Sequence, residues 1–550
     1  MDRTCRHCQQ GFVLTEDELA MVKKFDVPAP EQCFACGQKR RLLFRNGRHL
    51  YRRTCDATGD SIISIYAPDK PYKVYKSDFW FSDRWDPLDY AREIDFSRPF
   101  FDQLRDLILT VPRLALTNIN AVNSDYCNMS EGNKNCYLIF GGDFNEDSMY
   151  GIFGMRNKSV IDCDSSNENE RCYWMGDSFN CYGCQFTFDS KNCSDCAFIS
   201  DSTGCRDCIL CTNLTQKQYC IENEQLSKEE YEKHKAELLD GSHSRQGKNL
   251  ARLHDLRAKR IVRPAHILAS EDCSGDYIVN SKNCYACFDS WDCQDMRNII
   301  LASKTKDALN SSCIGDRTEM AYEMQSTINA YDCRFSFSVF DSQSVECSDF
   351  VLNSSNIFGG VCLNKKHYCI LNRQYSEEEF RRLRVKLIEH MKKTGEWGRF
   401  LPTSLCPFGY NESTAADYWP LTKEQALAEG FSWYDQQEEP LAVEKTIAAG
   451  QLPDGIVDTP DDVLNWAITC EKSGRLFRLI RQELEFYRQN NLPLPRLHPS
   501  ERHLERLSMR TPRYLHNRQC ANCKKAIKTV YTPDRPETVY CEECYLSAVY

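Results

Sequence analysis

The sequence predicts a mainly β protein with α-helical caps, in which two zinc-ribbon modules flank two tandem cysteine-rich β-solenoid repeats of the β-helix type. Three observations lead to this fold. Both ends carry spaced Cys-x-x-Cys pairs, the two ends align with each other without a gap, and the middle repeats a Cys-x-x-Cys pair every 12 residues. With 550 residues and 32 cysteines, the chain is long enough for several domains that each bury a core.

The predicted domains follow one another in seven segments, and both the modules and the solenoids are expected to be homologous pairs. The segments are an N-terminal zinc-ribbon module (1–80), a helical connector (81–120), the first solenoid copy (121–225), a capping helix and linker (226–262), the second solenoid copy (263–375), a capping helix and connector (376–465) and a C-terminal zinc-ribbon module (466–550).

The two ends of the chain are copies of one module. When the N-terminal residues are shifted by 465 positions, Cys5 aligns with Cys470, and YAPDKPYKVY (66–75) aligns with YTPDRPETVY (531–540). An ungapped match of this kind indicates an internal duplication.

Each copy has kept a different set of four cysteines. Structural zinc takes four thiolate or imidazole ligands, usually as two short-spaced pairs, and four cysteines leave no open position for catalysis. We therefore expect two structural Zn²⁺ ions as cofactors. Their predicted ligands are Cys5, Cys8, Cys33 and Cys36 in the first module, and Cys520, Cys523, Cys541 and Cys544 in the second.

The aligned positions of the opposite copy have lost most of their ligands. We infer that the ancestral module held two zinc ions and that the remaining Cys55 and Cys470 are now ordinary small side chains. The counterparts are Cys55, Thr58, Lys76 and Phe79 in the first module, and Cys470, Ser473, His498 and Glu501 in the second.

The middle of the chain is predicted to form two solenoids. Short strand-like segments alternate with tight turns rich in Asn, Asp and Ser, a repeat that is typical of stacked architectures. Each copy closes in the same way, with KQYCIENEQLSKEEY (217–231) and KHYCILNRQYSEEEF (366–380). The capping boxes in these segments predict helices that cover the last strand edge. Irregular metal-knuckle repeats without continuous sheets are the alternative.

The first solenoid copy contains three Cys-x-x-Cys pairs on a 12-residue period. Equivalent residues on neighbouring coils lie about 4.8 Å apart, so these pairs fit an additional metal site, disulfides or a ladder of buried thiols that act as small apolar side chains. The second copy carries mostly scattered cysteines, which favours buried thiols. The cysteines concerned are Cys181, Cys184, Cys193, Cys196, Cys205 and Cys208.

Charge is distributed unevenly along the chain. The net charge is −10, yet residues 1–76 carry +5 and residues 466–550 carry +6, so the middle is strongly acidic. Arginines beside aromatic residues suit contact with RNA, DNA or a nucleoprotein, and salt bridges onto the acidic middle are the alternative. The residues proposed for nucleic-acid contact are Arg40, Arg41, Arg45, Arg48, Arg53, Arg506, Arg510, Arg513 and Arg518.

Catalytic and membrane functions receive no support from the sequence. It lacks the motifs of dinucleotide-binding, P-loop, α/β-hydrolase and zinc-protease sites. Parallel β-helices can carry paired carboxylates for sugar cleavage, but no spacing here selects a pair, and we predict no catalytic residues. No run of 18 apolar residues and no apolar signal segment occur, so a cytoplasmic protein without membrane contact is expected.

The chain resembles an uncharacterised cysteine-rich zinc-ribbon family of candidate-phylum bacteria. The resemblance runs nearly end to end and implies zinc ribbons without an established activity. Some members carry the label CaiB/BaiF, a CoA-transferase family, but no residue here supports that chemistry. The motifs that carry it are TGDSIISIYAPDKPYKVY, DFSRPFFDQL, NSDYCN, CPFGYNES, QELEFYRQNNLPLPR and PDRPETVYCEECY.

These observations leave three functional hypotheses. The first is a zinc-binding, non-enzymatic scaffold or nucleic-acid-binding protein that acts through its basic ends, with strongly salt-dependent affinity. The second is a protein-interaction scaffold that uses a solenoid face and tolerates salt. The third is a solenoid carbohydrate-active enzyme.

Overall fold

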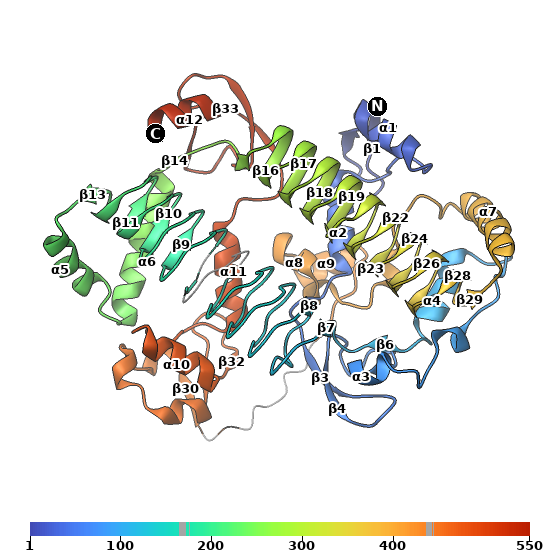
Figure 1. Ribbon diagram of the computed structural model, residues 1–550, viewed down its shortest axis with the longest axis horizontal. Coiled ribbons are helices and arrows are strands. Elements are labelled where there is room, and N and C mark those ends of the chain that lie inside the picture. Colours follow the sequence, from blue (N-terminus) through green and yellow to red (C-terminus); the bar gives the residue numbers. More distant parts are fainter. Residues whose placement is uncertain (164–171, 175, 436–442, 444, 550) are drawn as a thin grey trace.

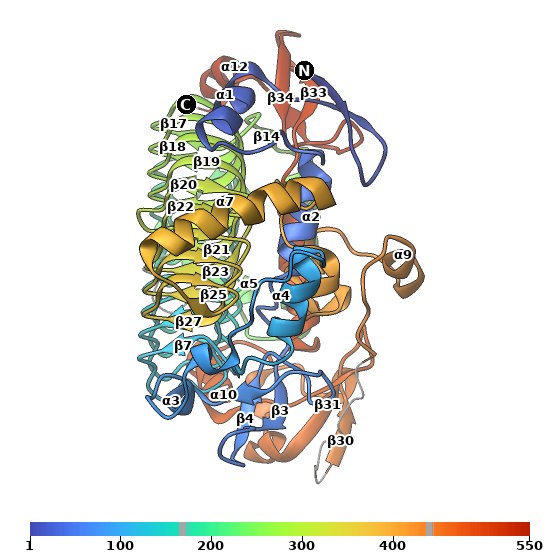
Figure 2. The same cartoon turned by 90° about the vertical axis from the view of Figure 1, so that its right-hand side faces the viewer.

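The computed structural model describes residues 1–163, 172–174, 176–435, 443 and 445–549. In these parts the protein is mainly β, with 12 α-helices around long stacks of parallel strands (Figure 1). Figure 2 shows the strands stacked one above another, with helices α2 (Phe34–Leu43) and α4 (Phe100–Ile108) on one side of them. None of the helices described is both long and apolar enough to cross a membrane.

The two end modules share one order of elements: a hairpin, two helices and a second hairpin. The N-terminal module contains β1 (Asp2–Thr4), β2 (Gly11–Val13), α1 (Glu16–Lys24), α2, β3 (Tyr51–Thr54) and β4 (Ser61–Ser64). The C-terminal module contains β31 (Trp466–Thr469), β32 (Leu476–Phe477), α10 (Arg481–Gln489), α11 (Pro499–Met509), β33 (His516–Gln519), β34 (Ala526–Thr529) and α12 (Glu542–Val549).

Residues 118–225, here called the first stack, pair in parallel at an offset of 12. Ala197 pairs with Gln185 on one side and with Ile209 on the other, and bridges from Val122 onward keep the same offset. The strands are β7 (Asn118–Ile119), β8 (Ser130–Glu131), β9 (Gln185–Phe188), β10 (Ala197–Ser200), β11 (Arg206–Thr212), β12 (Gln218–Ile221) and the antiparallel β13 (Glu224–Gln225).

Residues 267–374, the second stack, form a 15-stranded sheet with the same offset. One residue is inserted where Lys306 pairs with Glu319. Its strands are β15 (Ile267–Leu268), β16 (Glu271–Val279), β17 (Lys282–Trp291), β18 (Gln294–Ser303), β19 (Lys306–Gly315), β20 (Glu319–Tyr322), β21 (Gln325–Ile328), β22 (Tyr331–Arg334), β23 (Phe337–Phe340), β24 (Gln343–Glu346), β25 (Asp349–Leu352), β26 (Ser355–Phe358), β27 (Val361–Asn364), β28 (His367–Ile370) and β29 (Arg373–Gln374).

The buried interior of both stacks repeats every third residue. The residue before an interior position often has a positive φ, as at Asn180 and Asn192, a conformation that Asn, Asp and Gly adopt most readily. This explains the turn-rich composition of the middle. In the first stack the interior cluster consists of Val160, Cys163, Cys172, Cys181, Cys184, Cys193, Cys196, Ile199, Cys205, Cys208, Cys211 and Cys220.

A capping helix follows each stack, as predicted. Ser227 accepts a hydrogen bond from the amide of Glu230 at the start of α5 (Lys228–Leu238), and Ser376 does the same for Glu379 at the start of α7 (Glu377–Thr394). Helix α6 (His243–Lys259) continues from α5 and packs on β10 and β11.

Each module contacts both stacks. Helix α2 of the N-terminal module packs on β19 of the second stack, while β5 (Val74–Tyr75) pairs with β6 (Arg113–Leu114) just before the first stack. In the C-terminal module, α10 and the segment around α11 share a core with the first stack. Its β35 (Thr538–Val539) pairs with β14 (Ile261–Val262) just before the second stack. The duplication therefore extends to how the modules are attached.

Short elements connect these parts and complete the core beside the second stack. Residues of α2, the connectors, the second stack and α7 share one hydrophobic cluster. The connecting elements are α3 (Ser77–Trp80), α4, α8 (Thr414–Tyr418), α9 (Lys423–Ala428) and β30 (Lys445–Ala448).

Candidate metal centres and arginine junctions

Both predicted cysteine quartets are assembled. In each quartet the four Sγ atoms lie within 4.8 Å of one another, and these are the two groups in the described ranges that could hold a metal ion. In the N-terminal quartet, Cys5 and Cys8 come from the β1–β2 turn, and Cys33 and Cys36 from the start of α2. The Cys8 and Cys33 sulfurs are 3.9 Å apart.

The C-terminal quartet has the same construction. Cys520 and Cys523 lie in the β33–β34 turn, and Cys541 and Cys544 lie at the start of α12. The Cys523 and Cys541 sulfurs are 3.6 Å apart. A tetrahedral ion with Zn–S bonds of about 2.3 Å needs sulfurs about 3.8 Å apart, so both quartets fit zinc.

Backbone amides prepare these sulfurs as ligands. The Cys33 amide donates to the Cys5 sulfur at 3.3 Å, and the Cys541 amide donates to the Cys520 sulfur at 3.1 Å. Burial raises the pKa of Cys520, but hydrogen bonds from neighbouring amides, chiefly that of Cys541, lower it to about 6. Because the thiolate is the metal-binding form, such bonds favour metal uptake at neutral pH.

The two metal-free knuckles keep the same turn. The Cys5 amide donates to the carbonyl five residues later at 2.8 Å, and the Cys55 and Cys470 amides do the same at 2.8 and 2.9 Å. The Lys76 amide donates to the Cys55 sulfur, although Lys76 occupies a ligand position. The turn therefore persists where the ligand set is lost, which supports the duplication inferred from the sequence.

The six cysteines of the predicted ladder line the interior of the first stack. Each is at most 1% exposed. Their thiols donate mainly to backbone carbonyls: that of Cys184 reaches the carbonyls of Tyr182 at 3.3 Å and Cys193 at 3.5 Å. The repeated Cys-x-x-Cys spacing here reflects one interior position in three, whereas at the chain ends it reflects a metal knuckle.

The first-module arginines on α2 are directed into the protein. Arg41 is 1% exposed and donates to Glu323 of the second stack at 2.6 Å. Arg40 shares this carboxylate at 3.1 Å, and Arg45 donates to Ser326 at 2.9 Å. These three side chains attach the module to the second stack, as the alternative reading of the basic clusters expected.

The aligned arginines of the second module join the two stacks to each other. Arg510 donates to Asp177 of the first stack at 2.5 and 2.9 Å and to Asp289 of the second stack at 2.8 Å. Arg513 binds the other oxygen of Asp289 at 2.7 Å. All four side chains are at most 10% exposed.

The remaining predicted arginines also have partners inside the protein. Arg506 pairs with the buried Asp162 at 3.4 Å, and Arg48 lies 4.0 Å from Asp417. Sequence reasoning did not identify these acidic partners individually, because only the overall charge of the middle pointed to them.

Arg53 and Arg518 make the same contact in the two modules. Arg53 donates to the carbonyl of Ala67 at 3.3 Å, and Arg518 donates to that of Thr532 at 3.1 Å. The two acceptors align at the offset of 465. Both arginines therefore fix their own module's second hairpin.

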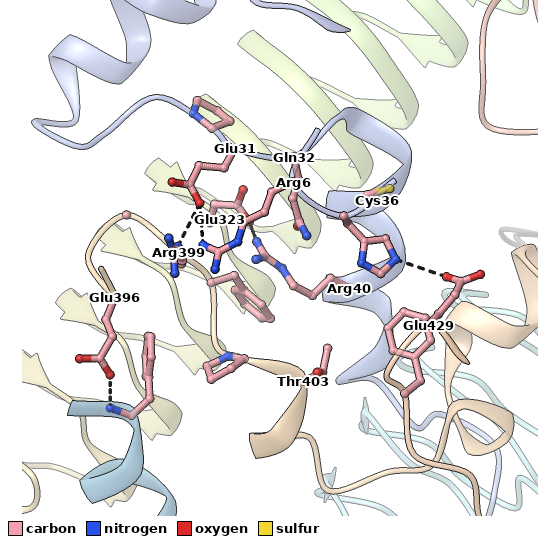
Figure 3. A pocket seen from close by; sticks show the side chains of 17 residues that line it. Arg6, Glu31, Gln32, Cys36, Arg40, Glu323, Glu396, Arg399, Thr403 and Glu429 are labelled. Carbon is pink, nitrogen blue, oxygen red and sulfur yellow. Dashed lines mark hydrogen bonds and ion pairs between the residues drawn. The ribbon is translucent and has the colours of Figure 1, made fainter. Parts of the chain in front are cut away.

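A pocket of about 290 Å³ adjoins the N-terminal quartet, and Cys36 lines it (Figure 3). Its charged groups pair with one another across the opening. Glu31 accepts from both Arg6 at 3.1 Å and Arg399 at 3.0 Å, and His7 lies 3.4 Å from Glu429. These ion pairs link the first knuckle to the connector that follows α7.

No protein-family model and no curated protein matches the sequence. Among solved structures, a protein from Desulfovibrio desulfuricans G20 described as a candidate acetyltransferase matches at 10% identity. The match covers 50% of this chain and 82% of that chain, with a TM-score of 0.10. This low TM-score carries no argument about fold or function.

Proposed function

We propose that this protein is a zinc-stabilised, non-enzymatic scaffold in which two zinc-ribbon modules hold two β-solenoids in a fixed arrangement. The observation that carries the proposal is the position of Arg510, whose guanidinium lies between Asp177 of one stack and Asp289 of the other. A buried ion pair of this kind is poorly suited to nucleic-acid contact and well suited to fixing geometry.

Three features support the assignment of the stacks as β-solenoids. Parallel strands repeat at an offset of 12 residues, one residue in three faces a narrow interior, and a capping helix follows each stack. Such an arrangement suits a rigid platform, because each coil is supported by its neighbours.

The quartets support zinc as the metal and structure as its role. Four sulfurs at tetrahedral spacing leave no position for water or substrate. The assignment agrees with the zinc ribbons that the family resemblance implies.

We propose a protein as the partner of the solenoid faces. Three tyrosines project from outer rows of the stacks: Tyr182 is 52% exposed, Tyr331 53% and Tyr285 39%. Tyrosine is enriched at protein interfaces and depleted charge favours salt-tolerant binding. Partner binding should therefore persist at 0.5 M salt, and its loss there would contradict this part of the proposal.

Removal of one metal tests the scaffold. In the Cys541→Ser/Cys544→Ser variant, the β35–β14 pair and the junction of Arg510 should lose protection from hydrogen exchange, because β35 immediately precedes Cys541. Strands β22 to β28 serve as the internal control and should stay protected. Unchanged exchange at β14 and at the first coils of the second stack would contradict a structural role for this metal.

Nucleic-acid binding is the second candidate, and a different surface favours it. Lys524, Lys525 and Lys528 on the β33–β34 hairpin are exposed, and no carboxylate partner is recorded for them in the described chain. If they bind phosphates, affinity for single-stranded RNA should fall steeply with salt, and charge reversal of all three should remove most of that slope. Salt-independent binding, or none, would exclude this candidate.

A further inference from the structure

The thiols inside the first stack form a connected ladder. Side-chain interactions join Cys181 to Cys184 and to Cys193, and similar interactions continue through the next two coils. One rail extends to Cys220 through its neighbour Cys208. The rungs are pairs within one coil, and the rails join residues 12 apart. The rails are Cys181, Cys193 and Cys205 on one side, and Cys184, Cys196, Cys208 and Cys220 on the other.

The fold does not require sulfur at these positions. The second stack has the same 12-residue repeat, but its interior is built largely from Ala, Val, Ile, Met and Ser. Serine also fills interior positions of the first stack itself, at Ser178, Ser190 and Ser202, all at most 1% exposed. The ladder therefore concentrates thiols beyond what packing needs.

The spacing of the ladder excludes a tetrahedral ion and admits a two-coordinate one. Outside the two quartets, no three ligand sulfurs in the described ranges come within 4.8 Å of one another. Sulfurs on neighbouring coils follow the strand spacing of about 4.8 Å, which leaves room for one ion between each pair. Soft thiolates select Cu(I) among biological metals, and Cu(I) accepts two sulfur ligands.

We propose that the thiol ladder binds soft monovalent ions of the Cu(I) type, independently of the two zinc quartets. Each ion lies between sulfurs of neighbouring coils, and a sulfur in the middle of a rail is shared by two ions. A rail of four thiols then takes up three ions and releases four protons to solvent, which leaves one net negative charge. A rail of three takes up two ions and releases three protons.

This sharing limits the charge that must be buried, which is the main obstacle to an ionic core. Burial raises the pKa of Cys220 to about 11, so the unoccupied ladder is protonated and neutral. Because the ladder sulfurs are at most 2% exposed, uptake is expected to accompany folding rather than follow it.

The test uses the full chain expressed with and without added copper and purified under anaerobic, reducing conditions. Elemental analysis should find Cu(I) only after copper supplementation, at most about five ions per chain, with zinc unchanged at two. X-ray absorption at the copper edge should report two sulfur neighbours. The variant Cys184→Ser/Cys196→Ser/Cys208→Ser should lose at least half of the copper and keep its zinc.

The matched control is Cys333→Ser/Cys369→Ser in the second stack, where the interior neighbours 12 residues away are Ala321, Val345 and Ile357. It should retain all the copper. Three results would overturn the proposal: no copper above the control level, copper that replaces zinc ion for ion, or ladder thiols found as disulfides by alkylation and mass spectrometry. If the triple variant does not fold, the coordination number in the unmodified protein decides, and three or four sulfur neighbours would refute the ladder geometry.

Discussion

Removal of Arg113 should destabilise the protein by several kcal/mol in a way that depends on pH. Arg113 precedes the first stack in β6 and pairs with Asp349 of the second stack at 2.5 Å, and both side chains are 1% exposed. It also donates to the hydroxyl of Tyr66 at 3.1 Å. The substitution Arg113→Met keeps the apolar stem but leaves the carboxylate of Asp349 buried without a partner.

The size of the effect follows from the charge that is left. Removing one partner of a buried pair typically costs about 3–5 kcal/mol. The carboxylate can escape only by taking a proton. Since an aspartate in the unfolded chain titrates near pH 3.9, neutralisation costs about 4 kcal/mol at pH 7 and about 1.5 kcal/mol at pH 5. The loss of stability should therefore shrink as the pH falls.

Urea unfolding followed by tryptophan fluorescence measures this loss. Trp80 lies at the junction, where its indole N–H donates to the carbonyl of Pro112 and its ring packs on Phe350. The double variant Arg113→Met/Asp349→Asn should recover most of the stability at pH 7, because the orphan charge is gone. A loss below about 1 kcal/mol at pH 7, or one that does not change between pH 7 and pH 5, would refute this reasoning.

An exposed ion pair provides the control for Arg113. Arg373 pairs with Glu93 on the surface, where the two side chains are 46% and 82% exposed. Arg373→Met should change the free energy of unfolding by no more than about 1 kcal/mol at either pH.

Three further predictions concern the second stack. Gly275→Ala should disrupt the β16–β17 bulge, because a Cβ there would lie 1.6 Å from the carbonyl oxygen of Cys287; Gly247→Ala in α6 meets no atom within 4 Å and should be tolerated or stabilising, as thermal unfolding can show. His266→Gln should flatten the pH dependence of stability above pH 6.5: burial lowers the pKa of His266, but Asp276 raises it more, so its contribution is complete at low pH and is lost as the pH rises through the folded-state value. Ile357→Ala, at a fully buried interior position, should cost about 2–5 kcal/mol by urea unfolding, and a loss below 1 kcal/mol would contradict close packing.

The sequence was sufficient to predict the metal ligands, because their spacing and the duplication point to the same residues. Cys5 and Cys520 begin knuckles that the alignment relates to Cys470 and Cys55, and the structure shows one turn at all four places. Local hydrogen bonding determines this turn, so a local pattern suffices to recognise it.

The roles of the arginines could not be predicted in the same way. Arg41 and Arg510 lie in basic clusters that resemble a nucleic-acid surface, yet their partners Glu323 and Asp177 are hundreds of positions away. Burial of a charge depends on which distant carboxylate the fold brings near, and no periodicity encodes that. The three-residue interior repeat was also missed, because Cys, Ser and Asn share its positions and obscure any apolar pattern.

The duplicated chain distributes its cysteine chemistry unequally between the two stacks. Both assembled quartets lie beside the beginning of the second stack: Phe34, between two ligands of the first quartet, packs against Phe288, and Val539, just before a ligand of the second, shares that cluster. The knuckles that lost their ligands, at Cys55 and Cys470, instead adjoin the segment leading into the first stack and that stack's own core. The first stack, flanked by metal-free knuckles, is the one with the thiol ladder. Loss of one zinc per module therefore removed metal from the side of the molecule where sulfur was kept in the interior, and packing alone gives no reason for that pairing.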